Sequence, residues 1–71
     1  MKPIYVTYTR VMHDLTTCRF AVQCENMDEA REICADLCSR PGVKNVRISQ
    51  SKPRLPEAKI LFYAEYIYHS K

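Results

Sequence analysis

Four cysteines have the most specific chemistry in this chain. Cys18 and Cys24 are six positions apart, and Cys34 and Cys38 are four positions apart. Neither pair has the C-x2-C spacing of a zinc ribbon. All four fall on the predicted core faces of a strand and a helix, where free cysteine commonly serves as a small buried hydrophobe. We therefore predict structural thiols and no metal, with convergence of the four on one zinc ion as the alternative.

The histidines and carboxylates give no stronger indication of catalysis. His13 and His69 fall in a loop and in the C-terminal tail, and their spacing from the cysteines does not predict a Cys–His nucleophile pair. Glu29, Glu32 and Asp36 are typical of a solvated helix face. A chain of 71 residues buries only about 60% of the surface that its unfolded form exposes, so a cofactor cavity would compete with the core. We expect a non-enzymatic protein without a cofactor.

Basic residues gather in the second half of the chain. Six of the eleven bases lie between Arg40 and Lys59, where Glu57 is the only acid, whereas five of the eight acids lie between Glu25 and Asp36. Such a segment can bind phosphates, and aromatic residues on a sheet can stack on bases. Nucleic-acid binding is therefore one hypothesis, although the chain lacks the RNP-like motif of an RRM domain.

The elements that position these residues follow from the periodicity of the chain. Alternating apolar residues predict four strands, at residues 4–12, about 17–25, 43–48 and 58–68. A helix is expected after Asn26, which caps it together with Glu29, and it ends before Pro41-Gly42. Residues 49–57 form a loop or arm that contains two prolines.

These elements predict a single α+β domain over residues 1–71, with the order β-β-α-β-β. A right-handed crossover through the helix places the third strand beside the first. The expected sheet is four-stranded and antiparallel throughout, with strand order 2-1-3-4 and the helix on one face. The opposite face of such a sheet can stay open to water or to a partner.

The open face is the predicted working surface. Strand 58–68 is apolar on both sides, which is unexpected for a strand that a helix covers on one side only. Tyrosine and arginine are enriched at interface hot spots. The predicted partner-binding residues are Tyr5, Arg19, Arg47 and Tyr63 on the face, and Lys44, Lys52 and Arg54 at its edge. A homodimer is the alternative to a different partner.

The chain has no apolar run of about 18 residues, so no membrane-spanning helix is expected. Its N-terminus enters an alternating pattern directly and does not resemble a signal peptide. These features predict a cytoplasmic protein, in which the cysteines are reduced.

Several short segments resemble phage-encoded inhibitors of host machinery. Phe20-Ala21-Val22, the run Asn26 to Ala30, Pro41-Gly42 and Val46-Arg47-Ile48 are similar to a short T-odd coliphage inhibitor of host RNA polymerase. In that inhibitor, arginines of the last strand contact the target. The resemblance assigns this role to Arg47 only, because Ser49 occupies the next matching position.

The length, the Met-Lys start and the strands after the helix are similar to small type I anti-CRISPR proteins. This resemblance implies a phage or prophage anti-defence protein that binds a large host nucleoprotein complex in the host cytoplasm and blocks it sterically. An inhibitor of host RNA polymerase and a small nucleic-acid-binding module are the alternatives. Mimicry of nucleic acid is a second route to inhibition, by the acidic helix face of Asp28, Glu29, Glu32 and Asp36.

Overall fold

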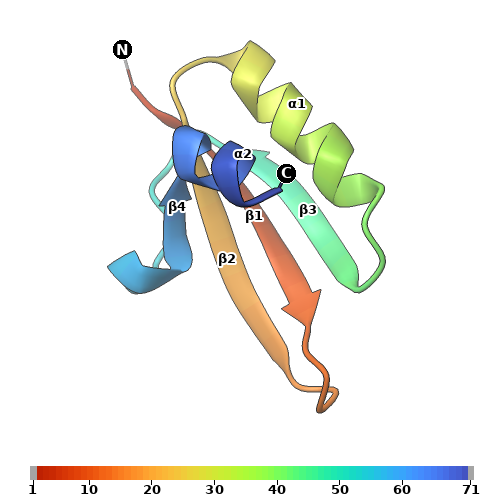
Figure 1. The fold of residues 1–71 in the computed structure, drawn as a ribbon. Coiled ribbons are helices and arrows are strands. Elements are labelled where there is room, and N and C mark those ends of the chain that lie inside the picture. Colours follow the sequence, from red (N-terminus) through yellow and green to blue (C-terminus); the bar gives the residue numbers. More distant parts are fainter. Residues whose placement is uncertain (1, 71) are drawn as a thin grey trace.

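A four-stranded mixed sheet with two helices on one face makes up the α+β fold of this chain (Figure 1). The computed structural model describes residues 2–70, apart from the side chain of Ser70. The elements are β1 (Ile4–Val11), β2 (Thr17–Cys24), α1 (Met27–Cys38), β3 (Val43–Ser49), the 3-10 turn η1 (Glu57–Lys59), β4 (Ile60–Phe62) and α2 (Tyr63–Ser70). Neither helix in this part of the chain is long and apolar enough to cross a membrane.

The first hairpin follows its alternating sequence. β1 and β2 pair antiparallel from Ile4 with Cys24 to Val11 with Thr17. In the turn, Asp14 Oδ1 accepts hydrogen bonds from the backbone N–H and the hydroxyl of Thr16, at 3.1 and 2.6 Å. The predicted strands and loop are confirmed.

Helix α1 begins and ends where the sequence predicts. Asn26 Oδ1 accepts a hydrogen bond from the Glu29 N–H at 2.9 Å, and Glu29 Oε1 accepts one from the Glu25 N–H at 2.9 Å. These bonds satisfy backbone donors that the first turn of a helix leaves unpaired. After the helix, Gly42 adopts a φ of +78° and its carbonyl accepts a hydrogen bond from Val11 N–H at 2.7 Å. The exit from the helix is thereby fixed to the end of β1.

Strand β3 pairs antiparallel with β1, as expected, and forms one edge of the sheet. A bulge interrupts the pairing between Thr7 and Thr9, and Asn45 adopts a φ of +57° there. A bulge and an exposed lysine, here Lys44, are common means of keeping an edge strand from pairing with another chain. The outer edge of β3 is therefore unsuited to receive a further strand.

The prediction of one strand over residues 58–68 beside the third strand is wrong, both in its secondary structure and in its position in the sheet. Only Ile60–Phe62 form a strand, and the following residues form α2. β4 pairs parallel with β2, which gives the sheet order β3-β1-β2-β4 in place of 2-1-3-4, with one parallel pair. The sheet is therefore mixed, and the chain continues into a second helix.

The sequence of α2 fits two periods, which explains the error. Tyr63, Tyr66 and Ile67 have the i, i+3, i+4 spacing of a helix face, although apolar residues also alternate through this run. Packing favours the helix, because Tyr66 then reaches the core and is only 6% exposed. The core combines sheet residues and both helices in one cluster: Val6, Tyr8, Val22, Cys24, Ala30, Ile33, Leu37 and Tyr66.

The connection between β3 and β4 crosses the sheet on the face away from the helices (Figure 1). The connection must cross the sheet because β3 and β4 lie at its opposite edges. Ser51–Leu55 of this connection line a hollow together with Thr7 of β1, which places them over the middle of that face. The face predicted to be open is thus partly covered by the chain itself, and Tyr5, Thr7 and Ala21 are buried there.

Candidate functional site

The covered face contains one strongly basic feature, which we call the basic hollow. It has a volume of about 540 Å³, and Thr7 lies among its lining residues. Four cationic side chains surround it, namely Arg19, Arg47, Lys52 and Arg54. The remaining lining residues are Ile48, Ser49, Ser51, Pro53 and Leu55.

Pairing across β1 brings the two strand arginines to the same face. Arg47 of β3 pairs with Thr7, and Arg19 of β2 pairs with Thr9. Thr7 and Thr9 are two positions apart on one strand, so their side chains and those of their partners point to one side of the sheet. Arg19 and Arg47 therefore flank β1 diagonally, from its two neighbouring strands.

The connection supplies the other two cations from a constrained backbone. Ser51 N–H donates a hydrogen bond to Ser49 Oγ at 3.1 Å, and Leu55 N–H donates one to the Pro53 carbonyl at 2.9 Å. Proline fixes φ, so Pro53 further restricts the segment between Lys52 and Arg54. These local constraints hold the two cations beside the sheet.

The four cations of the basic hollow form no ion pair with a carboxylate in the described part of the chain, although Lys52 also borders the adjoining hollow that Glu57 and Glu65 line. No acidic residue lines the hollow, and the ion pair between Asp36 and Arg40 is the only one within residues 2–70. Like charges gathered without counter-charges create a positive potential that attracts anions. The hydroxyls of Thr7, Ser49 and Ser51 add hydrogen-bonding groups to the lining.

The other predicted partner-binding residues are placed less favourably. Lys44 pairs with Thr9, so it shares the face of the hollow, at the exposed edge strand. Tyr5 lies on the same face but is only 5% exposed, so it presents little surface to a partner. Tyr63 belongs to α2, on the helix side of the sheet, and the prediction that it shares a face with Arg19 and Arg47 is wrong.

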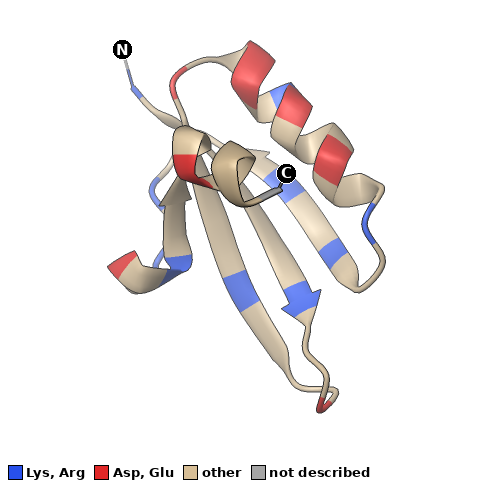
Figure 2. Ribbon diagram, in the orientation of Figure 1, with Lys and Arg blue, Asp and Glu red and all other residues tan. Residues whose placement is uncertain are grey.

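Tyr63 and Tyr66 instead bind α2 to the acidic side of α1. Tyr63 OH donates a hydrogen bond to Glu32 Oε2 at 2.6 Å, and the Tyr66 OH donates one to Asp36. Arg40 Nε also donates to Asp36 Oδ2, at 2.9 Å. Figure 2 shows the acidic residues along α1 and the basic residues on the strands. Of the four acids proposed to mimic nucleic acid, Glu29, Glu32 and Asp36 accept hydrogen bonds within the fold, and Asp28 is exposed.

These hydrogen bonds shift pKa values in opposite directions. The bond to the Glu32 carboxylate raises the pKa of Tyr63 to about 12, because ionisation of Tyr63 would remove the donated proton. The hydrogen bond from Tyr66, and then that from Arg40, lower the pKa of Asp36, because both stabilise its ionised form. An ionised Asp36 and a protonated Tyr63 therefore favour these two hydrogen bonds between α2 and α1.

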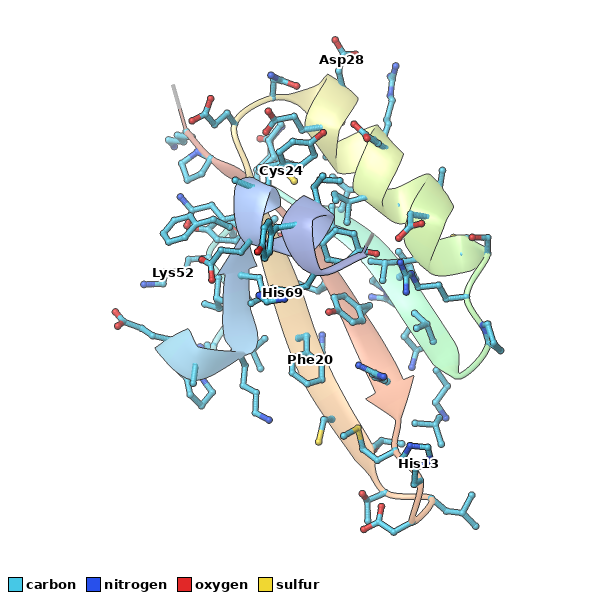
Figure 3. The ribbon with its side chains drawn as sticks, in the orientation of Figure 1. His13, Phe20, Cys24, Asp28, Lys52 and His69 are labelled. Atoms are coloured by element: carbon cyan, nitrogen blue, oxygen red, sulfur yellow. The ribbon has the colours of Figure 1, made fainter. Side chains whose placement is uncertain are left out.

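Replacement of Asp36 by asparagine should destabilise the fold at neutral pH but not in strong acid. Because the pKa of Asp36 is lowered in the folded state, its carboxylate stabilises the fold above the ordinary value of 3.8, and this stabilisation is lost as pH falls through the lowered pKa. Urea unfolding of wild type and Asp36→Asn at pH 7 and pH 2.5 measures the difference between their free energies of unfolding at each pH. Asp28→Asn is the matched control, because Asp28 is exposed at the other end of α1 (Figure 3). If Asp36→Asn lowered the free energy of unfolding equally at both pH values, the stabilising role of the ionised Asp36 carboxylate would be contradicted.

The cysteines are all free and occupy different environments. Cys24 is buried, Cys18 and Cys34 are half-buried, and Cys38 is exposed, so the prediction that all four lie in the core is wrong for Cys38. Burial, and then the nearby Glu29 carboxylate, raise the pKa of Cys24 to about 11. Within residues 2–70 no three His, Cys, Asp or Glu side chains are grouped as metal ligands.

A second hollow adjoins the basic one and was not predicted from the sequence. Lys52 lines both hollows, and Figure 3 shows its side chain beside β4. The lining of the second hollow includes Ala58, Ile60 and Phe62, which we call the apolar shelf. Gln23, Glu57, Leu61 and Glu65 complete the lining. The apolar character of both sides of residues 60–62 was the only sequence signal for this surface.

Comparisons of the chain with protein-family models, with curated proteins and with solved structures find no significant match. The function proposed below therefore rests on the geometry of the two adjoining hollows.

Proposed function

We propose that this chain is a non-enzymatic binding protein that holds the phosphate backbone of nucleic acid in its basic hollow. The observation that carries the proposal is the convergence of Arg19, Arg47, Lys52 and Arg54 on one hollow without a carboxylate. These cations come from two strands and from the connection that crosses the sheet. Residues far apart in the sequence are thus gathered into one anion-binding surface.

The chemistry of the lining suits phosphate groups. The guanidinium of arginine presents a planar set of donors that can bind two phosphate oxygens at once, and lysine adds a point charge. A single phosphate carries at most two negative charges, whereas four cations surround the hollow. A polyanion with several neighbouring phosphates matches this charge better than a small anion does.

The affinity for nucleic acid should fall steeply with salt. Each phosphate that a cation neutralises releases condensed counterions, which gives a slope of log K against log salt of about −0.7 per contact for single strands. Four contacts predict a slope of about −3. Fluorescence anisotropy of a labelled 20-nucleotide strand at several potassium chloride concentrations measures it. Absence of binding at low salt, or binding that does not change with salt, would overturn the proposal.

The second candidate function is the phage anti-defence inhibitor, which would dock the same face onto a host nucleoprotein complex and block it. Phe62, which is 58% exposed, lines the hollow that adjoins the arginines of the basic hollow, and exposed aromatic residues and arginines are enriched at protein interfaces. Arg47 is also the residue to which the resemblance assigns target contact. A second copy of the chain would be the alternative partner for this face.

Purified complexes distinguish the two candidates. The inhibitor should bind a type I CRISPR surveillance complex, or alternatively host RNA polymerase, after nuclease has removed accessible nucleic acid. Under that treatment, a protein that recognises only the phosphate backbone should lose its binding. Analytical ultracentrifugation of the chain alone reports whether it forms a dimer.

A further inference from the structure

The apolar shelf differs from the basic hollow in chemistry, although the two adjoin. Ile60 pairs with Ala21 and Phe62 pairs with Gln23 in the parallel register of β4 with β2. Alternation along β2 puts Ala21 and Gln23 on the same side as Arg19, so the shelf and the basic hollow lie on one face of the sheet. Phe62 is 58% exposed, which leaves an aromatic ring accessible beside Lys52.

The charges around the shelf favour an uncharged, flat group over a phosphate. Glu57 and Glu65 line this second hollow together with the shelf. Glu65 Oε1 accepts a hydrogen bond from Phe62 N–H at 3.4 Å, which keeps one carboxylate close to the strand. Carboxylates repel phosphates but accept hydrogen bonds from the exocyclic amino groups of bases. The Gln23 side-chain amide can donate to a base as well as accept from it.

We propose that the apolar shelf binds an unpaired base, stacked on Phe62, while the basic hollow holds the neighbouring phosphates. The ligand of this face is then single-stranded nucleic acid, an inference that rests on the proposed function above. Bases and phosphates alternate along a strand, and Lys52 lies where the two kinds of subsite meet. In a duplex the faces of the bases are stacked on one another, so they cannot reach the ring of Phe62. Sequence-tolerant binding of single strands commonly combines a basic groove with such an aromatic ring.

The test compares Phe62→Ala with wild type on three labelled probes: a 20-nucleotide single strand, the duplex of the same sequence and inorganic polyphosphate. Wild type should bind the single strand more tightly than the duplex. Phe62→Ala should weaken binding of the single strand about 5-fold to 100-fold, which is the range for loss of one stacked base. The same variant should bind polyphosphate as wild type does, since polyphosphate has no bases.

Two further variants keep the result interpretable. Phe62→Trp retains an aromatic face and should preserve single-strand affinity. Tyr68→Ala removes an aromatic ring that is 78% exposed on α2, outside both hollows, and should change nothing. Circular dichroism confirms that each variant is folded.

Equal affinity for the single strand and the duplex, or no loss of single-strand affinity in Phe62→Ala, would overturn this inference while leaving phosphate binding intact. Failure to bind any of the three probes would overturn the proposed function itself.

Discussion

Replacement of Arg19, Arg47, Lys52 and Arg54 by glutamine should reduce nucleic-acid affinity by about 1000-fold. Charge-assisted hydrogen bonds contribute about 1.5–3 kcal/mol each, and solvent screening at an exposed site lowers this to about 1 kcal/mol. Four such contacts correspond to about three orders of magnitude in the dissociation constant. Non-specific binding starts from dissociation constants of about 10⁻⁴ to 10⁻⁶ M, so the variant should show no measurable binding.

Net charge needs a control of its own, because the four changes lower it as well. Arg47→Gln/Arg54→Gln and Lys2→Gln/Arg31→Gln each remove two positive charges, but only the first pair lines the basic hollow. The first double variant should lose about 30-fold in affinity and the second should lose little. The fold should survive each change, because all the replaced side chains are exposed: Lys2, Arg19, Arg31, Arg47, Lys52 and Arg54. Equal losses in both double variants would mean that overall charge, not the hollow, determines binding.

Replacement of Tyr66 by alanine should cost about 3–5 kcal/mol of the free energy of unfolding, as truncation of a large buried aromatic does. Tyr66 is only 6% exposed, belongs to the core cluster and donates a hydrogen bond to Asp36. A domain of this size has a total stability of about 4–11 kcal/mol. The change therefore removes a large part of the stability, and urea unfolding followed by circular dichroism measures it.

Comparison with Tyr66→Phe separates packing from hydrogen bonding. Phenylalanine keeps the ring in the core and removes only the hydroxyl that donates to Asp36, whose side chain is partly exposed and still paired with Arg40, so the loss should be smaller, at about 1 kcal/mol. Hydrogen exchange should show faster exchange of the α2 amides in Tyr66→Ala, because Tyr66 is the residue of α2 that is buried in the core cluster. A loss below about 1 kcal/mol in Tyr66→Ala would contradict the packing of α2 into the core.

The phase of the alternation in β4 explains why part of the predicted surface was wrong. Ile60 and Phe62 pair with Ala21 and Gln23 and therefore face the side of Arg19, whereas Leu61 packs against the core. Tyr63 consequently lies on the helix side of the sheet, where Glu32 Oε2 accepts a hydrogen bond from its hydroxyl. The exposed aromatic residue on the face of Arg19 is instead Phe62, the last residue of β4, which lines the hollow that adjoins the basic hollow.

The sequence by itself determined the elements from β1 to β3. Strict alternation, the Asn26–Glu29 cap and the Pro41-Gly42 exit are local signals, and each acts through backbone geometry within a few residues. It also identified the bases Arg47, Lys52 and Arg54 as a feature of the second half of the chain, because charge clustering is visible without a fold.

Tertiary structure alone decided the end of the chain and the assembly of the site. Residues 58–68 satisfy both the strand and the helix period, so only the burial of Leu61 and Tyr66 against the core could select a short strand followed by a helix. The bulged edge of β3 and the free edge of β2 then determined where β4 pairs. That choice sends the connection across the sheet and brings Lys52 and Arg54 to Arg19, which no local pattern encodes because the contacts join distant parts of the chain.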